Sequence, residues 1–402
     1  LAIEPIPGWQ FYNKNQTFID RTYQDIRDMI RRDRNHPSIL TWETTLNESW
    51  PPKEWKDGAV RTGHEEYPGD QCFTSGDSYG YDGFDVCYND WEEGFNRPNK
   101  TGKPGFIREY YDYEFGGHYS TTRISRGDGD HALTQNAWNA QWSHNRYRAY
   151  YPWTMGGAIW SMYDYNRGCC DNICYSGLAD LFRLPKFGLA YFRTQVPAGS
   201  YTPAGKMPYE VFISHWMPDA SDTLQVYGNV DEVELLLNGK SLARRRPDNG
   251  PSTSEYVSRP DGGNAEHINY PPFTFFGVKW ESGELKAVGY KDGRKVAEQT
   301  VRTPGRAEAI DISYFESGVP ASRNDLLIVY VSLKDARGTG CFGENGQQVK
   351  LEVTAGGELR SPQQVNTEAG VASFLVATGN ASTLTLKATC GQLTATRKLK
   401  LK

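Results

Sequence analysis

The chain has 402 residues and a net charge of −5, and 13% of its residues are aromatic. This mild acidity argues against a general nucleic-acid-binding protein, because neutralising phosphates requires a basic surface. No apolar run approaches the roughly 18 residues that a membrane-spanning helix needs, so no membrane span is expected. The length allows two to four domains.

Up to residue 197, the pattern predicts strands that alternate with helices. Helices are predicted at Thr17–Arg32, His131–Tyr150 and Ala179–Thr194 from apolar residues at helical spacing. Short apolar segments bounded by Gly, Pro or Asp predict strands at Ser38–Trp42, Gln71–Ser75, Gly83–Tyr88, Pro104–Tyr110 and Gly156–Trp160. This alternation is typical of parallel β/α units.

The rest of the chain predicts strands and turns. A stretch rich in Pro and Gly over 197–208 is typical of a linker, and Asn238-Gly239 and Asp292-Gly293 are hairpin signals. A second break falls at 303–305, and Leu326–Leu333 predicts a strand beyond it. We therefore expect three domains, an α/β domain at 1–197 and two β-sandwiches at 203–304 and 306–402.

Two glutamates are placed after predicted strands. Glu48 follows Ser38–Trp42, and Glu109 lies near the end of Pro104–Tyr110. In a parallel β/α barrel, residues at the strand ends converge on the C-terminal face. Two carboxylates about 5 to 5.5 Å apart there carry out retaining glycoside hydrolysis, one protonating the leaving oxygen and the other attacking the anomeric carbon.

The segments around both glutamates resemble glycoside hydrolase family 2. Asn35-His36-Pro37-Ser38-Ile39 followed by Trp42 and Asn47-Glu48 is similar to the acid/base signature of that family, with one additional residue before Asn47. Arg108-Glu109-Tyr110 resembles the nucleophile strand, and Gly157-Ala158-Ile159-Trp160 resembles the eighth barrel strand. Ser176–Asp180 with Arg183–Lys186 is similar to the closing barrel helix of the β-galactosidase-like members, and Val226–Leu235 to the domain that follows it.

This resemblance implies a role for each residue of the predicted site. Glu48 is expected to be the acid/base and Glu109 the nucleophile, while Asn47 hydrogen-bonds the 2-hydroxyl of the sugar. His36 is expected to be a buried structural residue rather than a catalyst.

Four further residues are predicted to bind substrate. Trp160 would stack on the apolar face of the sugar, the alternative being a tryptophan of the barrel core. Tyr88 either donates its hydroxyl to Glu109 or serves ordinary packing. Asp112 and His118 follow the nucleophile and are predicted to contact sugar hydroxyls.

The fold implied by the resemblance is a (β/α)8 TIM barrel, incomplete at its N-terminus, followed by two immunoglobulin-like β-sandwiches. Family members carry further domains and the first barrel strands before the position of Leu1. A barrel without its opening strands cannot close. We therefore expect N-terminal domains or a companion chain to complete it.

The leading hypothesis is a retaining exo-β-glycosidase, a β-galactosidase acting on galactose-containing oligosaccharides. The alternatives are a β-glucuronidase or β-mannosidase of the same family, or a non-catalytic carbohydrate-binding or scaffold fragment. Asn166-Arg167-Gly168 lacks the lysine of the Asn-x-Lys motif expected in glucuronidases, which disfavours that activity.

No cofactor is expected to be required. Cys169, Cys170 and Cys174 lie close in sequence, but zinc needs four well-spaced ligands and no histidine is near them. Whether a Mg²⁺ or Na⁺ ion assists the reaction is left undecided by the sequence, since no cluster of carboxylates specifies a site for one. The oligomeric state also stays open, homo-oligomers included, and a periplasmic or secreted location is favoured.

Overall fold

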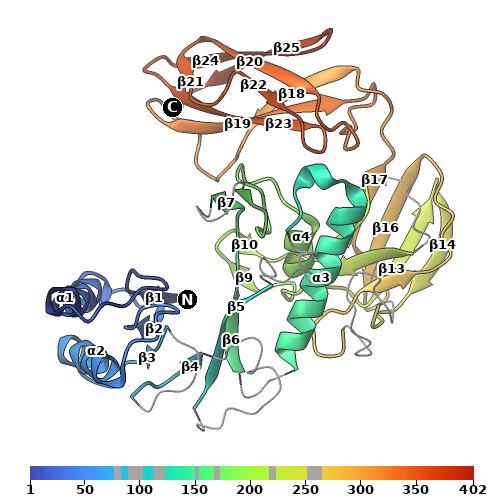
Figure 1. The fold of residues 1–402 in the computed structure, drawn as a ribbon. Helices are drawn as coiled ribbons and strands as arrows, with labels where there is room; N and C mark the ends of the chain where they lie inside the picture. Colours follow the sequence, from blue (N-terminus) through green and yellow to red (C-terminus); the bar gives the residue numbers. More distant parts are fainter. Residues whose placement is uncertain are drawn as a thin grey trace. The chain divides into compact units, whose positions relative to one another are not determined.

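The computed structural model describes residues 1–76, 83–88, 103–111, 123–149, 154–166, 173–216, 223–250 and 265–402. The chain divides into two compact units (Figure 1). The first contains Leu1–Tyr110 and Arg146–Trp160, and the second contains Tyr111–Asn145 and Ser161–Lys402. No helix in the described part of the chain is both long and apolar enough to cross a membrane.

Parallel strands form the centre of the first unit. One sheet has the order β1 (Ala2–Pro5), β2 (Ile39–Glu43), β3 (Phe73–Thr74), and another has the order β4 (Cys87–Tyr88), β5 (Gly105–Tyr110), β6 (Thr154–Ile159). A parallel bridge between Thr74 and Val86 joins them. The strands therefore follow one another in sequence order, as β/α units require. Because β1 and β6 are edge strands, the described strands form an open sheet and no closed barrel.

Two helices of the first unit follow its first two strands. The helix α1 (Gln16–Asp33) confirms the predicted helix, and its N-terminus is capped by the Asn15 side chain, which accepts from Thr17 N at 2.8 Å. The helix α2 (Lys53–Glu66) was not predicted. Gly58 and Gly63 make its sequence a poor helical pattern, yet a Cβ at either position would collide with Tyr23 or Phe73. Close packing of α2 therefore explains its glycines.

The described residues contain three further helices, η3 (Arg126–Asp128), α3 (Asp130–Arg148) and α4 (Phe187–Thr194). The helix predicted over Ala179–Thr194 is wrong in its first half, because α4 begins only at Phe187. Pro185 lacks an N–H group and disfavours helical geometry in the residue before it. In place of a helix, the Asp180 carboxylate accepts from the N–H groups of Phe182 and Leu184 in a tight turn.

Antiparallel strands dominate the second unit. One larger sheet has the strand order β11 (Val211–Ile213), β12 (Leu224–Gly228), β15 (Phe273–Phe275). The next has the order β14 (Lys240–Arg245), β13 (Glu232–Leu237), β16 (Glu284–Lys291), β17 (Arg294–Arg302). The two sheets share one apolar core. Asn238-Gly239 and Asp292-Gly293 have positive φ at both residues and close β13–β14 and β16–β17, which confirms both predicted hairpins.

The C-terminal strands also form two sheets around one core. The first has the strand order β18 (Ala309–Tyr314), β19 (Leu326–Lys334), β23 (Val371–Thr378), β21 (Gly357–Leu359). The second has the order β22 (Gln364–Asn366), β20 (Gln348–Ala355), β24 (Thr383–Cys390), β25 (Leu393–Lys400). Val329, Leu351, Phe374 and Leu386 are fully buried between them. Two short pairs, β7 (Tyr165–Asn166) with β8 (Ile173–Cys174) and β9 (Tyr201–Thr202) with β10 (Gly205–Lys206), precede these sheets.

Candidate active site

The predicted catalytic residues lie at the carboxyl ends of the parallel strands. Asn47 and Glu48 belong to the segment that follows β2, and Glu109 is the penultimate residue of β5. Trp160 directly follows β6. Because the strands are parallel, these positions share one edge of the sheet, where β/α proteins place their active sites.

The segment after β1 holds the Glu48 carboxylate. Oε2 of Glu48 accepts hydrogen bonds from Trp9 Nε1 at 2.8 Å and from Gln10 Nε2 at 2.9 Å. The backbone supports this contact, because Gln10 N donates to Asn47 O at 2.9 Å. Glu48 has a φ of 47°, in the left-handed region that a residue with a side chain seldom adopts. Its neighbours therefore hold both the backbone and the carboxylate of Glu48 in one orientation.

Arg108 connects the segment after β2 with the end of β5. Its guanidinium lies 3.3 Å from Glu109 Oε1, and the same nitrogen, Nη1, donates to Asn47 Oδ1. Asn47 and Glu109 are therefore gathered around one nitrogen atom. The contact also fixes the Asn47 amide, because its oxygen is occupied by Arg108 and its NH₂ group remains the donor.

A second carboxylate approaches Arg108 from the end of β2. Glu43 is only 2% exposed, and its Oε1 lies 3.4 Å from Arg108 Nη2. Tyr88 donates its hydroxyl to Glu43 Oε2 at 2.9 Å. Burial, followed by the negative charge of Glu43, raises the pKa of Tyr88 far above its ordinary value, so the hydroxyl remains a donor. One sequence-based alternative predicted that Tyr88 donates its hydroxyl to Glu109, whereas in the structure this hydroxyl donates to Glu43.

Glu43 and Arg108 have no role in the sequence-based prediction of the site. For Glu43 a signal existed, since a carboxylate that closes the apolar run Ile39–Trp42 ends a buried strand at the edge where the other candidates lie. For Arg108 the alternation of side chains along a strand gave no indication that it reaches Asn47, Glu43 and Glu109 together.

The other predicted residues are less closely tied to this cluster. Trp160 is 36% exposed and its backbone N donates to Tyr110 O at 3.0 Å, which prolongs the pairing of β5 with β6. Asp112 and His118 lie outside the described residues. The expectation that His36 is buried was wrong, because it is exposed in the turn before β2. Within the described ranges, no three His, Cys, Asp or Glu side chains are arranged to hold a metal ion.

Two comparisons of the sequence identify relatives. Residues 220–297 match a domain of unknown function (DUF4982). The chain is 29% identical over 391 residues to a β-galactosidase of Thermoanaerobacter pseudethanolicus, covering 92% of this chain and 49% of that protein. It is 25% identical over 347 residues to a β-glucuronidase of Formosa agariphila, covering 80% of this chain and 32% of that protein. The chain thus spans about half the length of two β-galactosidases that it matches.

Solved structures share the fold along the whole chain. A β-glycosidase from Bacteroides vulgatus superposes with a TM-score of 0.74 at 17% identity, covering 100% of this chain and 56% of that one. A β-glucuronidase from glycoside hydrolase family 2 superposes with a TM-score of 0.68 at 20% identity, covering 98% and 41%. The arrangement of strands and sheets is therefore that of these glycosidases.

Proposed function

We propose that the chain is part of a retaining exo-β-glycosidase that resembles the β-galactosidase-like members of glycoside hydrolase family 2, a proposal that these similarities support. The observation that supports this most is the cluster around Arg108. It gathers Asn47, which precedes the candidate acid, and Glu109, the candidate nucleophile, at the carboxyl edge of parallel strands. A carboxylate nucleophile beside an amide that can bind a sugar hydroxyl suits double displacement at an anomeric carbon, with Glu48, the next residue after Asn47, as the acid.

In this proposal the parallel strands are six of the eight in a (β/α)8 barrel. The open edges at β1 and β6 are where the remaining strands pair, supplied by N-terminal segments or by a companion chain. The barrel domain comprises residues 1–197. The two pairs of antiparallel sheets that follow are immunoglobulin-like sandwiches at 203–304 and 306–402.

The first half of the reaction forms a covalent intermediate. Glu109 attacks the anomeric carbon while Glu48 protonates the departing glycosidic oxygen, and the bond to the leaving group breaks. Trp9 and Gln10 hold the Glu48 carboxylate in place for this transfer. The NH₂ group of Asn47 donates to the 2-hydroxyl of the sugar, a contact that strengthens at the transition state.

The second half restores the enzyme. Glu48, now ionised, removes a proton from water, and the resulting hydroxide attacks the anomeric carbon and displaces the Glu109 carboxylate. Arg108 stabilises the negative charge that returns to Glu109, because a guanidinium 3.3 Å from a carboxylate interacts favourably with that charge. Two inversions leave the sugar with its original anomeric configuration.

We favour a β-galactoside in an oligosaccharide as substrate. The 29% identity to a β-galactosidase over most of the chain supports this choice, as does Asn166-Arg167-Gly168, which lacks the lysine expected in glucuronidases. The similarity to a β-glucuronidase keeps that activity as the second candidate. Rates of the full-length protein on aryl β-galactoside, β-glucuronide and β-mannoside decide between them, and a lack of turnover on all three favours a non-catalytic carbohydrate-binding or scaffold role.

The acid/base role of Glu48 is tested by varying the leaving group. Glu48→Ala should slow glycosylation of a natural galactoside by roughly 10² to 10⁴-fold, while an aryl glycoside with a very acidic phenol needs little protonation and should be spared in that step. Azide should accelerate breakdown of the intermediate and yield a β-glycosyl azide. Glu54→Gln, on the exposed face of α2, is the matched control. An unchanged dependence on leaving-group pKa, or an inverted product by NMR, contradicts the assignment.

A further inference from the structure

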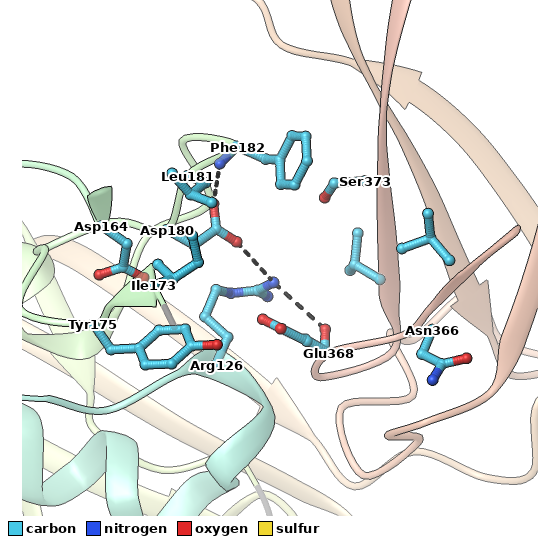
Figure 2. A pocket seen from close by; sticks show the side chains of 12 residues that line it. Arg126, Asp164, Ile173, Tyr175, Asp180, Leu181, Phe182, Asn366, Glu368 and Ser373 are labelled. Carbon is cyan, nitrogen blue, oxygen red and sulfur yellow. Dashed lines mark hydrogen bonds and ion pairs between the residues drawn. The ribbon is translucent and has the colours of Figure 1, made fainter. Parts of the chain in front are cut away.

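A cavity of about 110 Å³ lies in the second unit, and none of the residues that line it is assigned to catalysis (Figure 2). Asp180 and Phe182 line it from the turn before α4, and Glu368 and Ser373 line it from the C-terminal sheets. The side chain of Arg126 reaches between these two walls. The cavity has room for roughly seven to eleven water molecules, since each needs about 10–15 Å³ of such space. One pyranose ring with its hydroxyl groups is of this size.

Arg126 is buried in the cavity wall with part of its hydrogen-bonding capacity unused. It is 5% exposed, and Nη1 lies 3.8 Å from Asp180 Oδ2 and donates to Glu368 O at 3.5 Å. Its Nε has no hydrogen-bond partner among the described residues. A buried donor without a partner costs free energy.

Glu368 supplies the complementary acceptor. Its carboxylate is half-buried, and nothing in the described ranges forms a hydrogen bond or ion pair with it. Burial raises the pKa of Glu368, and the nearby charge of Asp180 raises it further. An acceptor of this kind is stabilised by a hydroxyl donor from a ligand.

We propose that this cavity binds one neutral sugar residue, a free monosaccharide or the terminal unit of an oligosaccharide. A sugar hydroxyl is both donor and acceptor, so neighbouring hydroxyls can accept from the Arg126 guanidinium and donate to Glu368. Phe182 and Tyr175 add aromatic surface for the C–H face of the ring.

Charged ligands fit the cavity less well. Asp164, Asp180 and Glu368 line it and repel an anion. A cation meets Arg126, and two of the three acids are already paired, Asp164 with Lys186 at 2.7 Å and Asp180 with Arg126. The lining thus presents both signs of charge at short range, which suits a neutral ligand with many hydroxyl groups.

The walls of the cavity are formed before any ligand binds. Lys186 is fully buried, and its ammonium donates to Asp164 Oδ1 and to Tyr175 O, each at 2.7 Å. Tyr330 donates to Phe182 O at 2.5 Å, which joins the turn to β19. A site held in this way loses little conformational entropy on binding.

Saturation-transfer NMR with D-galactose, D-glucose and D-mannose tests the proposal on the full-length protein. We expect at least one of the three sugars to receive saturation. Glu368→Gln, which keeps the shape but weakens the acceptor, should reduce affinity about tenfold or more, as expected for a hydrogen bond to a charged group. Ser373→Ala, a smaller change that the fold should tolerate, should weaken binding by a few-fold.

Glu358→Gln is the control, because Glu358 is an exposed glutamate on β21 that pairs with Arg360 outside the cavity. It should leave binding unchanged. Binding that is equal in wild type, Glu368→Gln and Ser373→Ala overturns the proposal, as does the absence of saturation transfer with all three sugars. The outcome does not depend on catalysis. If Glu109→Gln loses turnover but still binds sugar in a way that depends on Glu368, then catalysis and cavity binding take place at separate sites.

Discussion

Two arginines in this chain, Arg108 and Arg126, each contact acidic residues from different segments, and their surroundings differ. Arg108 is 3.4 Å from Glu43 and 3.3 Å from Glu109, and it donates to Asn47 as well. Every contact joins residues at the edge where the parallel strands end. Such a network keeps the candidate nucleophile and the candidate sugar-binding amide in fixed positions, which is what catalysis by positioned groups requires.

Arg126 has the opposite character. It is 3.8 Å from the Asp180 carboxylate, it reaches only the backbone oxygen of Glu368, and its Nε has no partner in the described part of the chain. Free hydrogen-bonding groups around a cavity are available to a ligand. The comparison therefore indicates that the first cluster orients groups of the protein itself, whereas the second cluster is arranged to receive a small polar molecule.

The largest effect is expected in the first cluster. Glu109→Gln should lower kcat/KM by about 10⁴-fold or more, because without a carboxylate nucleophile no covalent glycosyl intermediate forms. With the smaller Glu109→Gly, formate or azide should restore part of the turnover of an activated aryl glycoside by taking the place of the carboxylate. Wild-type turnover by either variant would remove Glu109 from the mechanism.

A smaller effect separates positioning from direct chemistry. Glu43→Gln keeps the shape of the side chain but removes the charge that Tyr88 and Arg108 contact. We therefore expect kcat to fall roughly 10 to 100-fold, which corresponds to the about 1.5–3 kcal/mol that a charge-assisted hydrogen bond contributes. Arg108 would then interact more strongly with Glu109, and the acidic limb of the kcat/KM profile should move to lower pH. A role in folding alone would lower the melting temperature and leave this profile in place.

The smallest effect concerns stability in the second cluster. Burial raises the pKa of Glu368 above its ordinary value of 4.5, so the folded state binds its proton more tightly than the unfolded state does. Stability from this group is therefore lost as pH rises above 4.5. Glu368→Gln cannot ionise and should raise the melting temperature by about 1–3 °C at pH 7.5 while changing little at pH 4.

Calorimetry at both pH values measures this difference, with the exposed Glu358→Gln as control. An equal change at pH 4 and pH 7.5 would show that the Glu368 carboxylate titrates as it does in the unfolded chain. The second cluster would then have no buried acceptor waiting for a ligand, and the contrast with the first cluster would fail.

The sequence by itself determined several local elements and singled out the two glutamates as candidates. Apolar spacing predicted α1, and the dipeptides Asn238-Gly239 and Asp292-Gly293 predicted their hairpins, because helical periodicity and turn chemistry act over a few residues. The resemblance to a glycosidase family singled out Glu48 and Glu109, which the structure places in the segment after β2 and near the end of β5.

Only the tertiary structure decided which side chains meet. It gave Tyr88 the partner Glu43, which is 45 residues away, and it placed Arg126 beside the backbone of Glu368 across 242 residues. It also allowed the glycines of α2 inside a helix, since they face large side chains at close range. Propensities and spacing describe neighbours along the chain, whereas these contacts depend on how distant segments pack, and that packing determines both the Arg108 network and the cavity at Arg126.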